Sequence, residues 1–154
     1  MNGVRDAGEA LFIACEMEKR AIRLYERALS VFPDSPCQAA VGAILSDERN
    51  HLRQFSQMGA TAAGFERAQL LSAQAGQVLF PGGLVEAQRR GAFDSVRALY
   101  AFAAEEELRA VQTYTGFAES LSGDASAAFS AIALEEKQHL NRLRELLALA
   151  GESE

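Results

Sequence analysis

One pattern occurs twice in this chain and constrains its fold more than any other feature. In each copy, Glu-x-x-Ala-x-x-x-Tyr is followed about thirty residues later by an acidic residue and then Glu-x-x-His. The first copy consists of Glu18, Ala21, Tyr25, Asp47, Glu48 and His51, and the second of Glu107, Ala110, Tyr114, Glu135, Glu136 and His139. The offset is 89 residues for the first half (18 to 107) and 88 for the second (48 to 136), so the two copies run nearly in register. The chain's only two histidines belong to this set.

Apolar residues around these motifs recur at helical spacing, with the motif glutamates in the middle of each apolar stripe. The expected helices span about 4–31, 36–58, 94–121 and 124–151. Ser35 suits an N-cap and Pro36 a first helical position, while Asp94 and Asp124 are expected to cap the third and fourth helices. Gly151 is expected to end the last one. This predicts an all-α four-helix bundle.

Residues 59–93 interrupt the helical pattern with several glycines, although 66–77 could form a short helix. A connection of this length is unusual unless it has a task. If the second and third helices are parallel, the chain must travel back along the bundle, about 30 Å for a helix of about 20 residues. We therefore expect one long crossover within a single domain that covers 1–154.

Composition excludes several classes of function. With 154 residues, 49% of them apolar, the chain suits one domain with a substantial core. A net charge of −6 without a basic stripe argues against nucleic acid as a partner. Cys15 and Cys37 form no Cys-x-x-Cys pair, so neither a thiolate zinc site nor a disulfide framework is expected. The sequence shows no signal peptide or membrane span, and we expect a cytoplasmic protein.

The motif residues are the ligand set of a carboxylate-bridged two-metal site in a four-helix bundle. Burying four unpaired carboxylates would cost several kcal/mol each, so they need cations. Glu and His three residues apart lie on one helix face and can reach the same ion. Oxygen and imidazole ligands without thiolate suit iron or manganese better than structural zinc. The predicted ligands are Glu18, Glu48, His51, Glu107, Glu136 and His139.

Acidic residues beside these ligands require separate interpretation. Internal symmetry pairs Glu105 with Glu16, and both, together with Glu106, are expected to be solvated. Asp47 and Glu135 leave two interpretations open. They are either surface acids or acceptors that fix the ring N–H of the histidine on the opposite helix.

Two tyrosines and one cysteine also share the inner stripes. Tyr25 and Tyr114 lie two turns beyond their glutamates. They either pack in the core with a satisfied hydroxyl or act beside the metals, as hydrogen-bond donors to a ligand carboxylate or as electron donors. Cys15 lies one turn before Glu18 and is read as a small buried apolar residue.

At these positions the chain resembles the ferritin-like di-iron domain of the rubrerythrin and bacterioferritin group. The resemblance rests on Glu18-x-x-Ala21-x-x-x-Tyr25, Glu48-x-x-His51, Glu107 before Tyr114, and Glu136-x-x-His139. It implies a ferritin-like bundle whose long crossover joins the second and third helices, and two iron ions, with manganese or a mixed pair as alternatives. It also implies that Glu48 and Glu136 bridge the ions, while Glu18 with His51 and Glu107 with His139 complete separate spheres. Which histidine shares an ion with which terminal glutamate stays open.

Departures from the group's pattern narrow the implied function. Rubrerythrins usually append an iron domain with two Cys-x-x-Cys pairs, which this sequence lacks, so electrons would come from an external, rubredoxin-like donor. Ala110 stands where rubrerythrins tend to carry an additional glutamate. Arg49 stands where bacterioferritins carry a haem-binding methionine, so no haem is expected. The fifth helix of cage-forming ferritins is also missing from this sequence, which favours a smaller assembly.

Three functions follow from the resemblance and the motif together. The first is a di-iron oxidoreductase that reduces peroxide or dioxygen. The second is a ferroxidase in iron storage or detoxification, and the third is an interaction module that the metals only stabilise. A homo-oligomer, most simply a dimer, is expected because Val78-Leu79-Phe80 and Leu84-Val85 in the crossover have no evident core to cover them.

Overall fold

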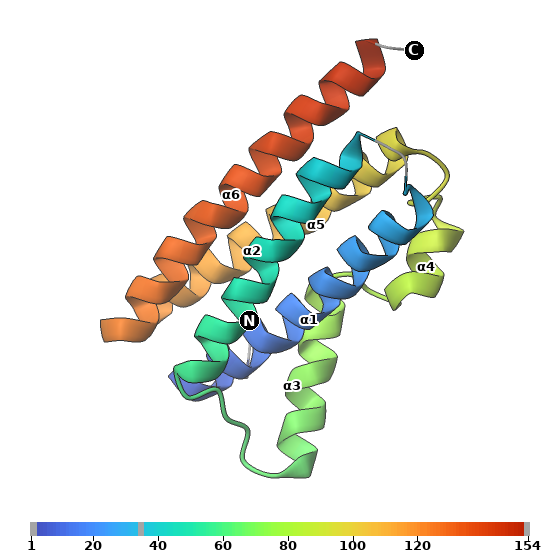
Figure 1. Cartoon of the computed structure of the whole chain (residues 1–154). Coiled ribbons are helices and arrows are strands. Elements are labelled where there is room, and N and C mark those ends of the chain that lie inside the picture. The colour runs from blue at the N-terminus through green and yellow to red at the C-terminus, as the bar shows by residue number, and fades with distance from the viewer. Residues whose placement is uncertain (1–2, 34–35, 153–154) are drawn as a thin grey trace.

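The fold is known from a computed structural model that describes residues 3–33 and 36–152, and these residues form helices and connections without any strand. The helices in chain order are α1 (Ala7–Val31), α2 (Cys37–Gln57), α3 (Phe65–Val78), α4 (Gly83–Arg89), α5 (Val96–Ser120) and α6 (Gly123–Glu152). The long helices α1, α2, α5 and α6 lie side by side as a bundle (Figure 1). The helical bundle expected from the sequence is therefore confirmed.

The first helix starts at a side-chain cap. Asp6 precedes α1 in extended conformation, and its carboxylate accepts the backbone N–H of Glu9 at 2.9 Å. Before α2, Pro36 has helical dihedral angles and the helix itself begins at Cys37. The predicted cap Ser35 lies outside the described residues.

Three predicted helix ends were wrong by one or two residues. Ser95, not Asp94, caps α5, because its hydroxyl accepts the N–H of Ala98 at 3.0 Å from an extended backbone. Asp124 lies inside the first turn of α6, which already begins at Gly123. Gly151 does not end α6, which continues to Glu152. Asp and Ser are both good caps, so two adjacent candidates cannot be ranked from composition.

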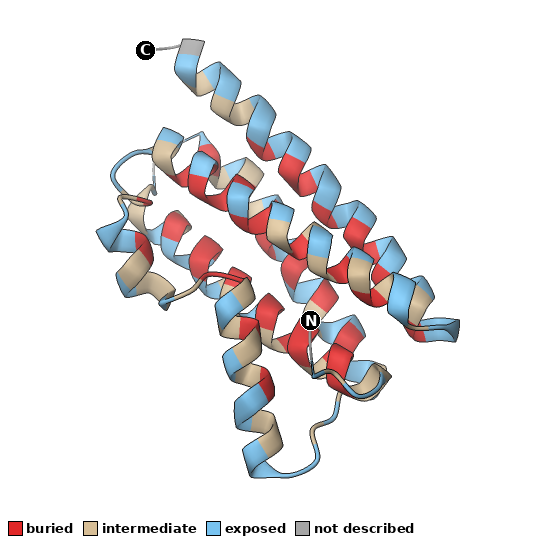
Figure 2. Ribbon diagram, turned by 180° about the vertical axis from the view of Figure 1, so that it is seen from behind, coloured by how far each residue is buried: buried red, intermediate tan, exposed pale blue. Residues whose placement is uncertain are grey.

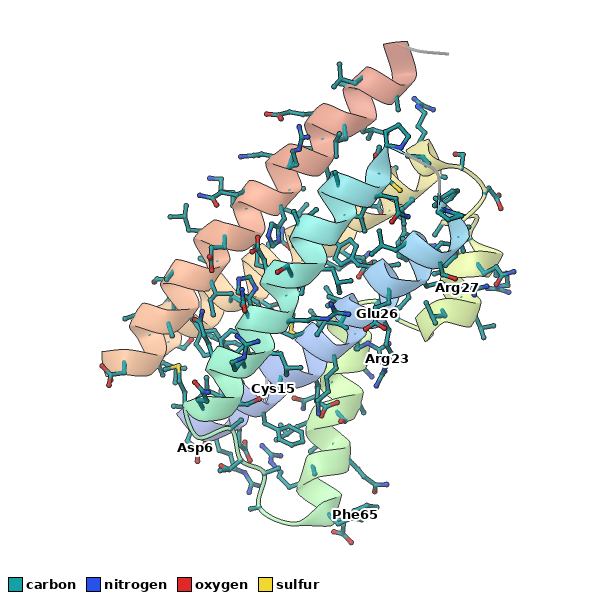
Figure 3. All side chains as sticks on the ribbon, in the orientation of Figure 1. Asp6, Cys15, Arg23, Glu26, Arg27 and Phe65 are labelled. Carbon is teal, nitrogen blue, oxygen red and sulfur yellow. The ribbon has the colours of Figure 1, made fainter. Side chains whose placement is uncertain are left out.

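The motif residues face the interior of the bundle, since each long helix has one buried stripe (Figure 2). On α1, Arg23 and Arg27 lie on the opposite, exposed side, as the sequence pattern predicts (Figure 3). The largest fully buried side chains include Tyr25, Tyr114 and His51. The polar motif thus lies inside an otherwise apolar core.

The connection between α2 and α5 passes along the outside of α1. Helices α2 and α5 run in the same direction, and α3 and α4 lie in the segment that returns the chain to the start of α5 (Figure 1). The short helix expected over 66–77 is α3. Helix α4, only seven residues long, was not predicted, because a periodic pattern needs a longer window to be visible.

One argument for an oligomer fails in the structure. Leu79 and Phe80 are only 4% and 2% exposed, because they are covered by the chain's own helices α1 and α5. Val85 remains 80% exposed and Leu84 is half-buried. The expected dimer therefore depends on this smaller patch and stays a prediction. Among the described helices, none combines the length and apolar character needed to cross a bilayer.

Candidate metal centre

The six predicted ligands come together at the centre of the bundle. Glu18 comes from α1, Glu48 and His51 from α2, Glu107 from α5, and Glu136 and His139 from α6. None of the six is more than 6% exposed. Each Glu-x-x-His pair places its two side chains on one face of its helix, which explains why both point inward.

These side chains form two overlapping groups, each of which could hold a metal ion. The first consists of Glu18, Glu48, His51 and Glu136, and the second of Glu48, Glu107, Glu136 and His139. Within each group, one ligand atom from every residue lies within 4.8 Å of the others. Glu48 and Glu136 belong to both groups, and Glu18 falls with His51 and Glu107 with His139. This is the division that the family resemblance implies.

Nδ1 of each histidine faces the carboxylates. His51 Nδ1 lies 3.0 Å from Glu136 Oε1 and 3.6 Å from Glu18 Oε1. His139 Nδ1 lies 3.0 Å from Glu48 Oε1 and 3.7 Å from Glu107 Oε1. The two imidazole rings are nearly parallel, with centroids 6.0 Å apart. Both rings therefore present a nitrogen to the same central space.

The other ring nitrogen of each histidine is held by an acid on the facing helix. His51 Nε2 donates to Glu135 Oε2 at 2.9 Å, and His139 Nε2 donates to Asp47 Oδ2 at 2.9 Å. Because a carboxylate accepts, Nε2 carries a proton, and Nδ1 is the ring nitrogen that remains for a ligand bond. The structure thus has the histidine contacts that one of the two interpretations of Asp47 and Glu135 requires. Both acids are about half exposed, at 50% and 47%.

Every predicted ligand has a buried polar atom without a hydrogen-bond partner. These atoms are Glu18 Oε2, Glu48 Oε1, His51 Nδ1, Glu107 Oε2, Glu136 Oε1 and His139 Nδ1. The 3.0 Å approaches of His51 Nδ1 and His139 Nδ1 to carboxylates are close enough but not aligned as hydrogen bonds. Unpartnered buried polar atoms are rare and costly. Six such atoms on residues that meet at the centre of the bundle are what a site for cations requires.

The electrostatics of the ligand cluster also favour bound cations. Burial, and then the neighbouring carboxylates, raise the pKa of Glu18 and Glu48, and the pKa of Glu107 is raised by burial and by Glu48. Burial alone would lower the pKa of His51, but the carboxylates of Glu136, Glu48 and Glu135 outweigh it and raise that pKa to about 9. The pKa of His139 is raised for the same reason. The cluster therefore has a high affinity for positive charge.

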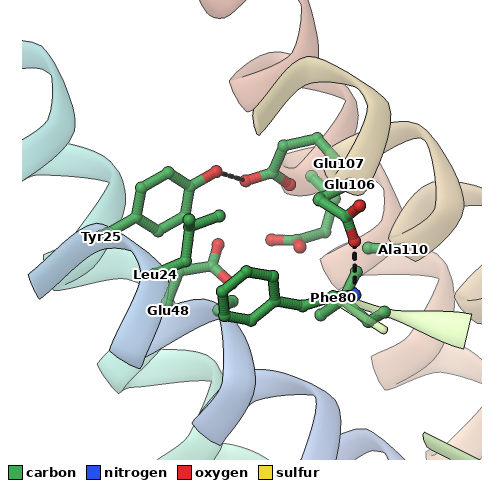
Figure 4. Close-up of a pocket in the computed structure, with 10 residues that line it drawn as sticks. Leu24, Tyr25, Glu48, Phe80, Glu106, Glu107 and Ala110 are labelled. Atoms are coloured by element: carbon green, nitrogen blue, oxygen red, sulfur yellow. Dashed lines mark hydrogen bonds between the residues drawn. The ribbon is translucent and has the colours of Figure 1, made fainter. Parts of the chain in front are cut away.

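Each tyrosine of the motif donates to a terminal glutamate on another helix. Tyr25 of α1 donates to Glu107 Oε1 at 2.5 Å, and Tyr114 of α5 donates to Glu18 Oε1 at 2.9 Å (Figure 4 shows the first). Burial, and then the nearby carboxylates, raise the pKa of both phenols well above 10, so both remain hydrogen-bond donors. Each terminal carboxylate is thus held through its Oε1, while Glu107 Oε2 and Glu18 Oε2 stay buried without a hydrogen-bond partner.

Glu106 contradicts its prediction as a solvated charge. It is 4% exposed, accepts the backbone N–H of Phe80 at 2.5 Å, and pairs with Arg109 at 2.6 Å. Glu105 is exposed as expected, whereas Glu16 is partly buried. A signal for Glu106 was present in the internal symmetry. The same offset of 89 pairs it with Met17, an apolar residue that is fully buried.

Cys15 is buried at 7% exposure, and its sulfur lies 3.7 Å from the hydroxyl of Ser56. Burial raises the pKa of the thiol, so it stays protonated. It belongs to neither ligand group. The donor set therefore contains carboxylates and imidazoles only, as hard and borderline metals prefer.

Compared with family models, curated proteins and solved structures, the chain shows no significant match to any of them. The assignment of a function to this centre therefore depends on its geometry and on the motif.

Proposed function

We propose that this chain is a ferritin-like di-iron carboxylate oxidoreductase of the rubrerythrin type, which reduces peroxide or dioxygen with electrons from an external donor. The observation that carries the proposal is the pair of overlapping ligand groups that share Glu48 and Glu136. A site for one ion has no need of a second, symmetry-related group. Carboxylates shared between two cations are the usual feature of two-metal sites.

The residues present fit such a pair of ions. Glu48 and Glu136 would bridge them, Glu18 with His51 would complete one sphere, and Glu107 with His139 the other. Four carboxylates would balance the four positive charges of two Fe²⁺ ions, which makes the centre neutral enough for an apolar core. When bound, the iron pair supplies the two electrons that peroxide or dioxygen takes up.

The residues around the ligands hold them in place. Asp47 and Glu135 fix the tautomer of His139 and His51, so that Nδ1 remains available as a ligand. Tyr25 and Tyr114 restrict the terminal glutamates to one rotamer and keep one oxygen of each occupied. Because both phenols stay protonated, each keeps donating its hydrogen bond to the carboxylate that it touches.

The ferritin-like topology is part of this proposal. Its support is the common direction of α2 and α5, which requires the chain to return along the bundle between them. In this proposal the electrons come from an external, rubredoxin-like donor.

The first experiment measures metal content and identity. We expect two ions per chain, with anomalous scattering at the iron edge, or at the manganese edge if manganese is loaded, about 3.5–4 Å apart. Glu48→Ala and Glu136→Ala should each lose paired occupancy, whereas the exposed Glu105→Ala should retain it. Two ions that remained in the double-alanine protein would overturn the assignment of the bridge.

The second experiment tests the reaction. The reduced protein is mixed with hydrogen peroxide in a stopped-flow instrument, and we expect oxidation of both irons with about one peroxide consumed per metal pair, since each peroxide accepts two electrons and two protons to give two waters. A large particle that accumulates mineral would instead indicate iron storage. Metals that keep their oxidation state would indicate a stabilising clamp.

A further inference from the structure

A small cavity lies directly beside the ligand carboxylates. It has a volume of about 10 Å³, which is room for about one water-sized molecule. Glu48, Glu107 and Glu136 form its polar wall, and the other lining residues are Ala21, Leu24, Tyr25, Leu79, Phe80, Glu106 and Ala110 (Figure 4). All of these residues are buried, so the cavity has little contact with solvent.

The cavity exists because two motif positions carry small side chains. Ala21 follows Glu18 by three residues on α1, and Ala110 follows Glu107 by three residues on α5. Both alanines line the cavity between these helices. A larger side chain at either position would fill a space of this size, so the alanine of the repeated motif gains a role that the metal ligands alone do not explain.

Two residues of the crossover, Leu79 and Phe80, line this cavity. Phe80 has a φ of +56°, and it is the one non-glycine residue with positive φ in the described ranges 3–33 and 36–152. Positive φ is unfavourable for a bulky residue and persists only where surrounding contacts enforce it. The backbone is therefore held in an unfavourable conformation at the residue whose ring covers the cavity.

Contacts from α1 and α5 enforce this conformation. Arg20 of α1 donates through Nε to the Leu79 carbonyl at 2.7 Å and through Nη2 to the Phe80 carbonyl. Glu106 of α5 accepts the Phe80 N–H at 2.5 Å. The Phe80 ring also packs edge-on against Phe102, with centroids 5.9 Å apart. The crossover is thus hydrogen-bonded to both α1 and α5, the two helices on either side of the cavity.

The tyrosine of the second half of the motif has different surroundings. Tyr114, the partner of Tyr25 in the repeat, packs against Phe55 and Phe129 with ring centroids 5.5 and 5.7 Å away. These rings belong to the bundle helices α2 and α6. Tyr25 instead lines the cavity, so the pseudo-symmetric centre has a cavity beside one tyrosine and packed aromatic rings beside the other.

We propose that Phe80 is a specificity-determining residue, which restricts access to the ligand cluster to molecules of diatomic size and excludes organic hydroperoxides. The inference depends on the proposed function for the identity of the reactant and adds the residue that selects it. Hydrogen peroxide and dioxygen, with two heavy atoms each, are the oxidants nearest in size to the cavity, whereas tert-butyl hydroperoxide requires the Phe80 ring to be displaced.

The test compares two oxidants on the iron-loaded wild type and on Phe80→Gly. Glycine removes the ring and tolerates the positive φ, so this variant is less disruptive than alanine at the same position. The rate constant with tert-butyl hydroperoxide should rise about tenfold or more, because steric selection by a pocket has at least that magnitude. The rate constant with hydrogen peroxide should change much less. The matched control is Phe117→Ala, a buried phenylalanine outside the cavity lining, which should leave the ratio unchanged.

A second measurement requires no metal. Crystals of the metal-free full chain under xenon pressure should show xenon between Ala21 and Ala110 in Phe80→Gly and none there in the wild type. If Phe80→Gly does not fold, Phe80→Leu provides the same comparison with a shorter apolar side chain.

The outcomes separate this inference from the proposed function. Loss of discrimination together with xenon at the cavity supports it. A wild type that reacts equally with both hydroperoxides, or a variant with unchanged selectivity and no xenon, overturns the role of Phe80 and leaves the di-iron proposal intact. A wild type that binds iron and ignores hydrogen peroxide overturns the proposed function instead, while the xenon result still decides whether Phe80 closes the cavity.

Discussion

The hydroxyl of Tyr25 on α1 donates a 2.5 Å hydrogen bond to Glu107 Oε1 on α5, and this bond joins the two halves of the repeated motif across the bundle. Its counterpart, from Tyr114 to Glu18 Oε1, is 2.9 Å long. Each tyrosine therefore orients the glutamate of the other copy. The two copies of the motif are therefore related by reciprocal hydrogen bonds, in which the tyrosine of each copy donates to the glutamate of the other. Neither copy can form this ligand geometry alone.

Removal of a tyrosine hydroxyl should weaken metal binding without removing a ligand. In Tyr25→Phe, Glu107 Oε1 loses its donor and the carboxylate is free to rotate. We expect metal affinity to fall about 10-fold to 100-fold, measured by competition with a chelator of known affinity. Tyr100→Phe, at a buried tyrosine on α5, the helix that carries Glu107, is the control and should bind as the wild type does. Equal affinity in Tyr25→Phe would mean that the phenol only fills space.

Neutralising the acids that hold the histidines should have a comparable effect. Asp47→Asn and Glu135→Gln remove the charge that favours the Nε2–H tautomer of His139 and His51. We expect each to lower metal affinity by about 10-fold or more, in the same chelator competition. Glu145→Gln, an exposed acid on α6, is the matched control. If Asp47→Asn and Glu145→Gln behaved alike, Asp47 would be a surface acid only.

The sequence predicted those features of the site that depend on the geometry of a single helix. Spacing of three or four residues fixes which side chains share a face, so the positions of Glu48 and His51 could be predicted before any packing was known. The repeat then relates the two halves. Helix ends were less certain because Asp94 and Ser95 are adjacent and both suit a cap.

The contacts that Phe80 of the crossover makes with α1 and α5 could not be predicted from the sequence, for a physical reason. Phe80 meets Arg20 across 60 residues and Glu106 across 26, and such contacts leave no periodic trace in a sequence. The glycine-rich surroundings suggested an exposed segment, and Leu79 and Phe80 were wrongly expected to need a second subunit. Glu106 was missed because three consecutive acids resemble a solvated face, although its symmetry partner Met17 is apolar.

Removing the metals should destabilise the protein, because the unpartnered atoms of the cluster then lose their cations. With free metal at 100 times its dissociation constant, binding adds about 2.7 kcal/mol to the free energy of unfolding. For a chain of this length that corresponds to a rise in Tm of about 5–10 °C. Calorimetry of the loaded and chelated protein measures the difference. The double variant Glu48→Ala/Glu136→Ala should show almost none, and a Tm unaffected by chelation in the wild type would argue against a buried cation site.

The ion pair between Glu9 and Arg67 fastens the start of α1 to α3 and should make stability depend on pH. Arg67 contacts both carboxylate oxygens at 2.6 Å. Mainly through this bond, the pKa of Glu9 is lowered from 4.5 to about 2. A lowered pKa means that the folded state prefers the ionised form, so the stabilisation is complete above the unfolded-state value of 4.5 and is lost as the pH falls toward 2.

Glu9→Gln isolates this contribution. The metal-free wild type should unfold at a higher urea concentration than metal-free Glu9→Gln at about pH 7. The two midpoints should converge as the pH falls from 4.5 toward 2 and Glu9 becomes protonated. Titration of the ligand carboxylates is common to both proteins and cancels in the difference. Glu16→Gln, which removes a partly exposed surface pair with Lys19, should show no such convergence. If the urea midpoints of the wild type and of Glu9→Gln differed by the same amount at every pH, the effect of Glu9 would come from packing and hydrogen bonding and not from its charge.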